Sequence, residues 1–505
     1  MTEGVPRRTF FKLCSALAAW MAGPPRPAVA APQGGRRTVN NRKNFVAIQM
    51  KAHAWIDEGI EQCLDNLQKG AVNTIWAYTY DWEMGPRNTP GGTIPLPDHG
   101  KYGDPAFHGG AFFNYDAKYF RGTILSDFRS PDFGANWDVI AEVAPKAKAR
   151  GMDFFCWDYN NESRRMMQNM PNAAKTAEVD VYGRRMIGPC FNHPDYRAHQ
   201  IGKIESYLRQ YPNEVAGIAW GCERQGPFQN VMGGGWTSEG IGCFCEHCRA
   251  KARERGISAD RARTGYIEFA RLIRAAAQDQ RPADGYFVTF WRMLLEYPEI
   301  LAWEKLWTDS YHEVRSELYG AAKTIAPEKP FGFHIMQNMT FSPFYRAEED
   351  YSKTKNYADY LKLATYNNAG GPRMKAYLDR LSATLFHDAK PDDFVQFYYK
   401  LMNYQEGPYE TLNTRGLTPD YLAREVKRAR ASTGPDVKLY PGVDIDVPTR
   451  QTDKRTKPDD VRKSVRAAFD AGADGVVLAR EYVEMWMANL SAAGETLREI
   501  FARRG

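Results

Sequence analysis

The sequence predicts an α/β fold in which eight parallel strands close into a (β/α)8 TIM barrel with inserted loops and helices. Two observations support this prediction. Short apolar and aromatic runs alternate with helical stretches along most of the chain, which indicates a parallel sheet. The alternation yields eight strands, the number at which such a sheet closes. An open doubly wound sheet is the alternative, but residues 50–55, which follow the first strand, contain no glycine for a phosphate-binding loop.

Each predicted strand is a short apolar or aromatic segment, and helical periodicity separates it from the next one. In chain order the predicted strands cover residues 45–50, 73–80, 152–157, 215–220, 331–336, 360–365, 437–440 and 475–478. The predicted helices cover residues 56–69, 137–150, 195–210, 259–278, 286–325, 458–471 and 483–503. Residues 44–505 are therefore expected to form one barrel domain.

The first 30 residues resemble a twin-arginine export signal. Arg7 and Arg8 precede an apolar stretch, residues 13–21, that is too short to span a bilayer, and small residues follow at 28–30. We expect cleavage before Ala31, a flexible leader over residues 31–43, and export by the twin-arginine machinery to the periplasm or the medium without a remaining membrane span. The net charge of +6 is half supplied by residues 1–30, so the mature chain is not expected to bind nucleic acid.

The cysteines give a separate signal. Three of them fall within residues 243–248, too close together to pair with one another without strain. Three converging thiolates suit a tetrahedral zinc ion that needs a fourth ligand. Four protein ligands leave no open position, so the Zn2+ would be structural. The predicted ligands are Cys190, Cys243, Cys245 and Cys248. His193 or His247 as a ligand, disulfides in an oxidising compartment, and free thiols are the alternatives.

Three segments in sequence resemble glycoside hydrolase family 42, a family of β-galactosidases. They are residues 182–197 (YGRRMIGPCFNHPDYR), residues 217–223 (GIAWGCE) and the Cys-x-Cys-x-x-Cys cluster that follows. The resemblance extends over about residues 180–370. It implies a clan A barrel, a carbohydrate substrate, an acid/base glutamate at the end of strand four, and a zinc ion held by the four-cysteine set.

The sequence also departs from that family. Cys222 stands where the family has the asparagine that precedes its acid/base glutamate. Residues 226–242 are an insertion, and the cysteine-rich zinc loop is expected at about residues 226–256. After strand seven, where the family has its nucleophilic glutamate, residues 440–446 read YPGVDID and contain no glutamate. The chain is therefore identified as a remote relative of this family.

Active sites of such barrels lie at the C-terminal ends of the strands, and here those ends are rich in carboxylates and aromatic residues. Cleavage of a glycosidic bond needs one carboxyl to protonate the leaving oxygen and another to attack or to activate water. We predict Glu223 as the general acid/base, with a pKa raised by Trp220 and Cys222. Asp444 is predicted as the nucleophile or base, and Glu481 is the competing carboxylate.

Aromatic and polar residues at the other strand ends are expected to form a rim that faces the sugar. The predicted rim consists of Trp76, Tyr80, Trp157, Asp158, Asn160, His334, Tyr366, Asn367 and Glu481. Burial inside the barrel is the alternative for Trp76 and Trp157, and a solvated loop is the alternative for any single polar residue. The sequence thus predicts an exported glycoside hydrolase that cleaves an oligo- or polysaccharide. A catalytically inactive carbohydrate-binding barrel is the second hypothesis.

Overall fold

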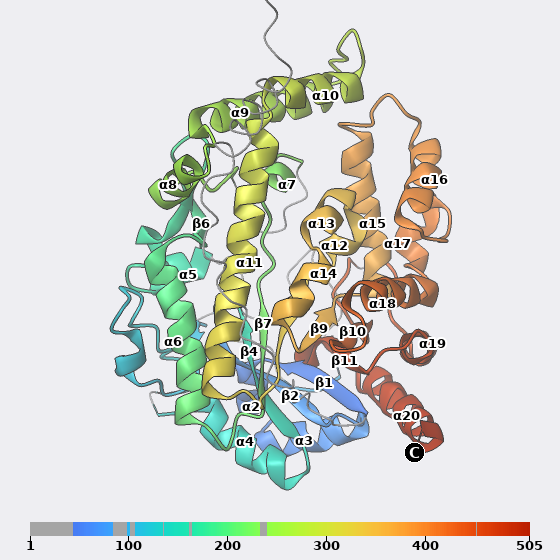
Figure 1. Ribbon diagram of the computed structural model, residues 1–505. Helices are drawn as coiled ribbons and strands as arrows, with labels where there is room; N and C mark the ends of the chain where they lie inside the picture. The colour runs from blue at the N-terminus through green and yellow to red at the C-terminus, as the bar shows by residue number, and fades with distance from the viewer. Residues whose placement is uncertain are drawn as a thin grey trace, which may run out of the picture. The chain divides into compact units, whose positions relative to one another are not determined.

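Eight parallel strands close into a barrel, which confirms the predicted fold class (Figure 1). Around the barrel each strand pairs with the next, and β11 pairs back onto β1 through Val46 and Val476. Every predicted strand is present. The barrel strands are β1 (Phe45–Met50), β2 (Thr74–Asp81), β4 (Asp153–Tyr159), β7 (Gly217–Gly221), β8 (Phe331–Ile335), β9 (Tyr360–Leu363), β10 (Lys438–Asp444) and β11 (Gly475–Glu481).

The computed structural model describes residues 44–83, 98–100, 107–134, 136–160, 164–232, 240–450 and 452–504. The predicted signal peptide and leader, residues 1–43, lie outside the described residues, as does the segment 233–239 of the predicted cysteine-rich loop. Among the helices described, none is long and apolar enough to cross a membrane.

Helices that follow the strands form the outer layer of the barrel (Figure 1). Two predicted helices are each replaced by a pair. Gly59, with a positive φ of 91°, separates α2 from α3, and Pro298 separates α10 from α11 because the residue before a proline disfavours helix. The helices of this layer are α2 (Ala52–Asp57), α3 (Ile60–Lys69), α4 (Val139–Ala149), α6 (Pro194–Gln210), α11 (Glu299–Ile325), α18 (Pro419–Thr433), α19 (Pro458–Asp470) and α20 (Met487–Arg504). Two further helices, α9 (Ala259–Ala276) and α10 (Tyr286–Glu296), lie at the upper end of α11 in Figure 1, away from the strands.

Shorter elements are inserted between the barrel units, mostly after the strands' C-terminal ends. β3 (Gly110–Ala111) adds to β2 in antiparallel sense, and β5 (Ala177–Val179) pairs with β6 (Arg185–Pro189). The inserted helices are α5 (Arg164–Asn169), α7 (Pro227–Val231), α8 (Glu246–Glu254), α12 (Asn338–Phe341), α13 (Pro343–Glu348), α14 (Tyr351–Thr354), α15 (Asn367–Ser382), α16 (Pro391–Met402) and α17 (Leu412–Arg415). Five single turns of 3₁₀ helix, η1 to η5, complete the described elements; they are Ala117–Phe120, Ala173–Lys175, Lys355–Tyr357, Tyr409–Thr411 and Tyr482–Glu484.

Aromatic side chains fill the interior of the barrel. Phe45 stacks on Tyr440 with ring centroids 3.9 Å apart. Glycines on neighbouring strands make room for other rings: a Cβ added at Gly217 would lie 2.6 Å from the ring of Phe155, and one added at Gly332 would lie 2.4 Å from the ring of Tyr360. The interior is therefore a packed core and not an open channel.

Candidate active site at the barrel mouth

The two tryptophans predicted to face the sugar lie in the barrel core instead. Trp76 and Trp157 have no exposed surface and stack on each other at 5.4 Å. Trp157 also stacks on Tyr159 and meets His334 edge-on at 5.8 Å. Both tryptophans occupy inward strand positions below the mouth, where neighbouring strands cover them. The prediction of sugar-facing rings is therefore corrected: Trp157 is part of the floor beneath the site.

Tyr80, Asp158 and Asn160 belong to a buried cluster between the barrel and α6, not to the rim. Lys203 of α6 lies 2.7 Å from Asp158 Oδ1 and 2.8 Å from Asn160 Oδ1. Its Nζ also lies 3.8 Å from the centre of the Tyr80 ring. Each of these side chains is buried. A register shift between residues 78 and 80 turns the end of β2, so Tyr80 faces the helix layer.

Asp444 is buried, and both oxygens of its carboxyl accept hydrogen bonds from neighbouring loops and helices. Its Oδ2 accepts from Ala369 N at 2.8 Å, and its Oδ1 accepts from Val447 N at 3.1 Å and from Thr456 Oγ1 at 3.0 Å. The residue is fully buried, and burial raises the pKa of its carboxyl. Asp444 thus fixes the first turn of α15, and its predicted role as the nucleophile is corrected to a structural one.

Two other polar residues near the ends of β9 and β10, Asn367 and Asp446, also form hydrogen bonds within the protein. Asn367 Oδ1 accepts from Ser464 Oγ at 3.1 Å, and its Nδ2 donates to Leu417 O at 3.4 Å. Asp446 Oδ2 accepts from Trp486 N at 2.9 Å. Asn367 is buried, so its predicted contact with substrate is corrected as well.

Glu223 lies at the barrel mouth as predicted, but its charge state differs from the prediction. Its Oε1 lies 2.7 Å from His334 Nε2, and its side chain is 30% exposed. Burial would raise the pKa of Glu223, but the hydrogen bond from His334 and the charges of Lys362 and Arg373 lower it to about 2. Glu223 is therefore ionised at neutral pH.

Trp220 and Cys222 do not desolvate the carboxyl of Glu223 as predicted, because successive side chains of a strand point in opposite directions. Trp220 points to the helix layer, where its Nε1 donates to Gln200 of α6 at 3.3 Å. Cys222 shares that outward side, and Tyr311 of α11 donates to its backbone carbonyl at 3.2 Å. Neither side chain therefore faces the carboxyl of Glu223.

His334 is a neutral hydrogen-bond donor to Glu223. Burial and the charge of Lys362 together lower the pKa of His334 to about 4, although Glu223 opposes the shift. With Glu223 ionised, the ring proton is assigned to Nε2, and the buried Nδ1 has no hydrogen-bond partner among the described residues. The predicted rim residue His334 thus lies in the site as the group that orients Glu223.

Two cations beside Glu223, Lys362 and Arg373, were not predicted, and neither was Arg480, whose charge acts on Lys362. Burial and the charges of Arg480 and Arg373 lower the pKa of Lys362 to about 7, although the charge of Glu223 opposes the shift. The Lys362 ammonium donates to Tyr366 Oη, which places this predicted rim residue beside it. Arg373 donates to Gln337 Oε1 at 2.8 Å. Lys362 lies within β9 and Arg373 within α15, so neither residue follows a strand end, where functional residues of a barrel are expected.

Glu481, the competing carboxylate, lies at the end of β11 in the same mouth. Its Oε1 accepts from Tyr78 Oη at 2.6 Å and lies 3.7 Å from Lys51 Nζ. Burial would raise the pKa of Glu481, but Lys51 and Arg480 hold it below its usual value. Oε2 is buried and has no hydrogen-bond partner within the described part of the chain. Glu481 is thus a second ionised carboxylate at the mouth, and its charge acts on Lys362 together with that of Glu223.

The four predicted metal ligands come together at one point. The sulfur atoms of Cys190, Cys243, Cys245 and Cys248 all lie within 4.8 Å of one another. Cys190 Sγ lies 3.4 Å from Cys248 Sγ and 3.4 Å from Cys245 Sγ, so these thiols are free. Asn192 donates to two of the sulfurs, from its backbone N to Cys190 and from its Nδ2 to Cys248, each at 3.3 Å.

Comparison with known proteins identifies neighbours in fold. No family model and no curated protein matches the sequence. Among solved structures, the β-galactosidase from Rahnella sp. R3 has a TM-score of 0.52 at 13% identity and covers 92% of this chain and 57% of that chain. The β-galactosidase from Marinomonas ef1 gives 0.53 at 12%, covering 91% and 60%. The enzyme from Halorubrum lacusprofundi gives 0.52 at 13%, covering 90% and 58%.

This chain therefore spans less than two thirds of the length of those β-galactosidases. At such low identity the likeness concerns the fold. It agrees with the strand order, in which eight parallel strands close on themselves. The chain has a (β/α)8 barrel of the kind that these β-galactosidases contain.

Proposed function

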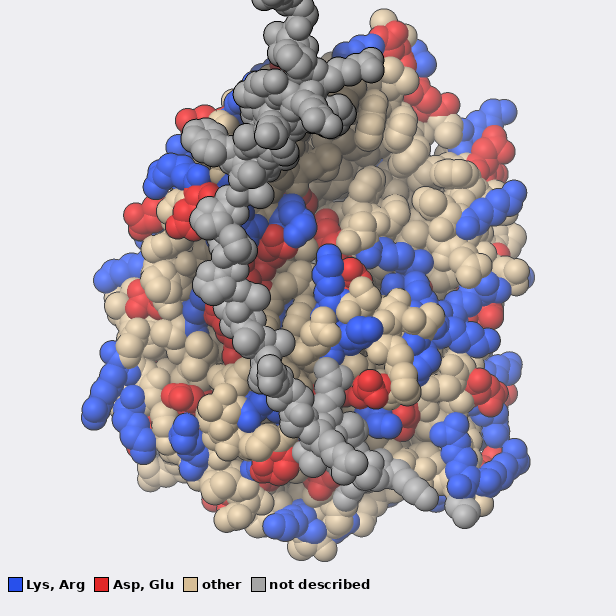
Figure 2. All heavy atoms as spheres, in the orientation of Figure 1, with Lys and Arg blue, Asp and Glu red and all other residues tan. Residues whose placement is uncertain are grey.

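We propose that this protein cleaves glycosidic bonds at the mouth of its barrel, with Glu223 as the carboxylate that contacts the sugar. The accessibility of Glu223 carries the proposal: it is 30% exposed, whereas Asp444 is fully buried and Glu481 is 5% exposed. The fold shared with β-galactosidases supports a carbohydrate substrate. Basic and acidic side chains are interspersed over the face shown in Figure 2, so a neutral sugar meets no strong field of one sign there.

The charge states around Glu223 determine the chemistry that we propose. An ionised Glu223 attacks the anomeric carbon or takes a proton from the attacking water. Glu481, also ionised, stabilises the positive charge that develops on the sugar ring. The leaving oxygen needs a proton, and neither carboxylate holds one at neutral pH. We assign this proton to Lys362: Tyr366 Oη gives its proton to the leaving oxygen and receives one from Lys362 Nζ.

Aryl glycosides and polysaccharides assayed with the purified protein test the proposal. Glu223→Gln should lower turnover by roughly 10²-fold or more, because the variant cannot attack or accept a proton. Glu499→Gln, at an exposed ion pair on α20, is the matched control and should leave turnover unchanged. Turnover should fall above about pH 7 as Lys362 loses its proton. Unchanged turnover in Glu223→Gln would exclude the assignment, and NMR of the first products identifies retention or inversion.

A carbohydrate-binding barrel without catalysis is the second candidate. One observation favours it: the carboxylates at the end of β10 and just after it, Asp444 and Asp446, both accept structural hydrogen bonds. Under this alternative, polysaccharide binds to the wild-type protein and to Glu223→Gln, and no glycoside in the panel is cleaved by either. Cleavage by the wild-type protein alone rejects it.

We also propose that the four cysteines hold one structural zinc ion. Zinc–sulfur bonds of about 2.3 Å imply edges of about 3.8 Å in a sulfur tetrahedron, which the observed 3.4 Å contacts and the 4.8 Å limit bracket. The N–H groups of Asn192 that point at sulfur would stabilise thiolate ligands. Metal analysis should find about one zinc per chain in the wild-type protein and none in Cys245→Ser. Metal-free wild-type protein with Cys190 in a disulfide would contradict the site.

Export by the twin-arginine machinery remains our proposal for residues 1–30. Expression in a bacterial host with and without a functional twin-arginine translocase tests it. Mass spectrometry of the exported protein should give a chain that begins at Ala31, and substitution of Arg7 and Arg8 by lysine should leave the uncleaved protein in the cytoplasm.

A further inference from the structure

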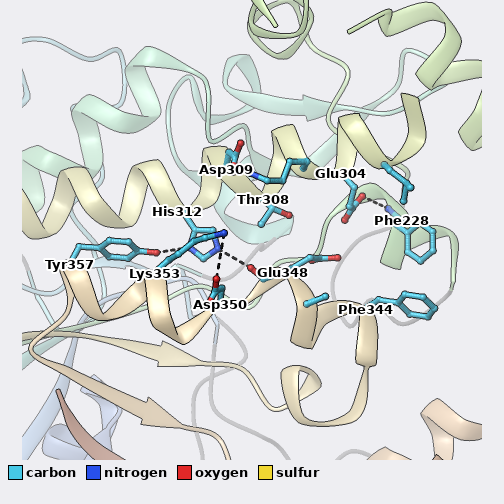
Figure 3. Close-up of a pocket in the computed structure, with 13 residues that line it drawn as sticks. Phe228, Glu304, Thr308, Asp309, His312, Phe344, Glu348, Asp350, Lys353 and Tyr357 are labelled. Carbon is cyan, nitrogen blue, oxygen red and sulfur yellow. Dashed lines mark hydrogen bonds and ion pairs between the residues drawn. The ribbon is translucent and has the colours of Figure 1, made fainter. Parts of the chain in front are cut away.

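A cavity of about 420 Å³ lies outside the barrel, between α11 and the α13–α14 segment (Figure 3). Its volume falls in the range of small-molecule sites. Apolar groups form much of its wall, among them Phe228, Leu301, Phe344 and Tyr357. None of the residues that line it belongs to the group around Glu223 and Glu481 in the barrel mouth, so it is a separate candidate site.

Glu304 of α11 brings a buried carboxylate to this cavity. The residue is 7% exposed. Its Oε2 accepts from Phe228 N at 2.8 Å and from Tyr266 Oη at 2.9 Å, while its Oε1 has no hydrogen-bond partner among the described residues. Gly226 leaves space for this oxygen, since an added Cβ would lie 1.9 Å from Oε1. One oxygen of the carboxylate is thus fixed by the protein, and the other is buried against Gly226 without a hydrogen-bond partner among the described residues.

Glu348 of α13 supplies a second carboxylate. In Figure 3 its side chain and that of Glu304 point into the cavity from opposite walls. Burial raises the pKa of Glu304 to about 7. Burial and the charge of Glu304 likewise raise the pKa of Glu348. No ion pair with Glu348 occurs within the described ranges. The raised pKa values mean that the pair holds protons near neutral pH when no ligand is bound, and a positive charge placed between the two groups would favour their ionised forms.

The remaining charges of the wall are already paired. Asp309 lies 2.7 Å from Arg255 and also pairs with Lys305, and Asp350 lies 3.4 Å from Lys353. Burial lowers the pKa of His312, so this residue adds no positive charge; its ring nitrogens bond to Tyr357 Oη and to the backbone carbonyl of residue 348. Among the described residues of the wall, Glu304 and Glu348 are therefore the acidic groups that have no cationic partner.

Thr308 adds a third polar group. It is 7% exposed, and its Oγ1 is buried without a hydrogen-bond partner in the described part of the chain. Thr308 lies one helical turn after Glu304, so the hydroxyl and the carboxylate lie on the same face of α11, which faces the cavity. Two carboxylates and a hydroxyl are acceptors that match the three donors of a primary ammonium group.

We propose that this cavity binds an organic cation, a primary ammonium group attached to an apolar body. The ammonium lies between Glu304 and Glu348 and donates to Oε1 of Glu304, to the Glu348 carboxylate and to Thr308 Oγ1. The apolar body packs against Phe228, Phe344 and the other apolar wall groups, and the aromatic rings add cation–π attraction. A metal ion fits this cavity less well because much of the wall is apolar and offers no ligand atoms.

Calorimetric titration of the full-length protein with benzylamine at pH 7.5 tests the proposal. Benzylamine should bind saturably at one site. Benzyl alcohol has the same shape without the charge and should bind at least tenfold more weakly. Glu348→Gln should weaken benzylamine binding roughly 10- to 100-fold through loss of a charge-assisted hydrogen bond. The variant should fold because a neutral amide replaces a carboxyl that is itself protonated in the absence of a ligand. Glu499→Gln on α20 is the matched control and should bind as the wild-type protein does.

Three results would overturn the proposal. The first is the absence of saturable benzylamine binding. The second is equal binding of benzylamine and benzyl alcohol, which would mean that the cavity recognises only the apolar body. The third is binding that Glu348→Gln leaves unchanged; if Glu223→Gln weakens it instead, the amine occupies the barrel mouth. The two proposals have separate readouts, so either can fail alone. Turnover in Glu223→Gln tests the proposed hydrolase, and benzylamine binding in Glu348→Gln tests the cavity.

Discussion

Replacement of Asp444 by alanine distinguishes a structural carboxylate from a catalytic one. The substitution removes the acceptor of two backbone donors, Ala369 N and Val447 N, in a fully buried position. Each buried donor left without a partner costs about 1–3 kcal/mol. Thr456 can turn its hydroxyl to another acceptor, so it adds little. The two backbone groups together predict a loss of about 2–6 kcal/mol in the free energy of unfolding.

Urea unfolding followed by tryptophan fluorescence and by far-UV circular dichroism measures this loss, provided that the two transitions coincide. Asp444→Asn keeps one acceptor oxygen and should lose about half as much as Asp444→Ala. Asp436→Ala, at an exposed position just before β10, is the control and should change stability by less than about 0.5 kcal/mol. The reasoning is refuted if Asp444→Ala is as stable as the wild-type protein while its turnover is abolished.

Three further substitutions probe other parts of the barrel. Folded His334 has a pKa of about 4, below its ordinary 6.5, so the unfolded chain takes up this proton first and stability falls as the pH decreases from about 6.5 to 4. His334→Gln should flatten that fall in the urea midpoint, and a decline as steep as in the wild-type protein contradicts the assignment. Lys203→Met should lower the free energy of unfolding by about 3–5 kcal/mol because it leaves the buried Asp158 carboxylate unpaired. If the broken ion pair is the cause, the double variant with Asp158→Leu should recover most of this loss. Gly332→Ala should lower the free energy of unfolding by about 1–3 kcal/mol because the added methyl group clashes with Tyr360. The double variant with Tyr360→Leu should regain most of this loss; no recovery would mean that backbone movement, and not the ring, absorbs the clash.

The strands could be predicted from the sequence because a strand buried on both faces is a continuous apolar run. β10 and β11 are longer than predicted: they continue to Asp444 and Glu481, beyond the predicted ends at residues 440 and 478. Pro441 and Gly442 hide the extension of β10, since both residues disfavour strands. α15 was likewise missed, because two glycines and Pro372 interrupt the helical pattern near its start.

The candidate site could be predicted only in part, because side-chain direction depends on three-dimensional contacts. Glu223, His334 and Tyr366 lie at the mouth as expected, since each follows or ends a barrel strand. Asp158 instead faces α6, where Lys203 pairs with it. The charge state of Glu223 depends on Lys362 and Arg373, which are far from it in sequence. Such contacts form when the barrel closes, and no short sequence pattern indicates them.

Glycines opposite aromatic rings give the barrel interior a consequence for related sequences. Gly217 faces Phe155, Gly332 faces Tyr360, and in each pair ring and glycine stand on adjacent strands. The two members share one volume, so neither position can enlarge unless the other shrinks. Among descendants of a common ancestor, these positions should therefore change as coupled pairs that conserve summed volume. Such covariation would trace the registration of strands in homologues that lack a structure, and it would do so independently of any catalytic residue.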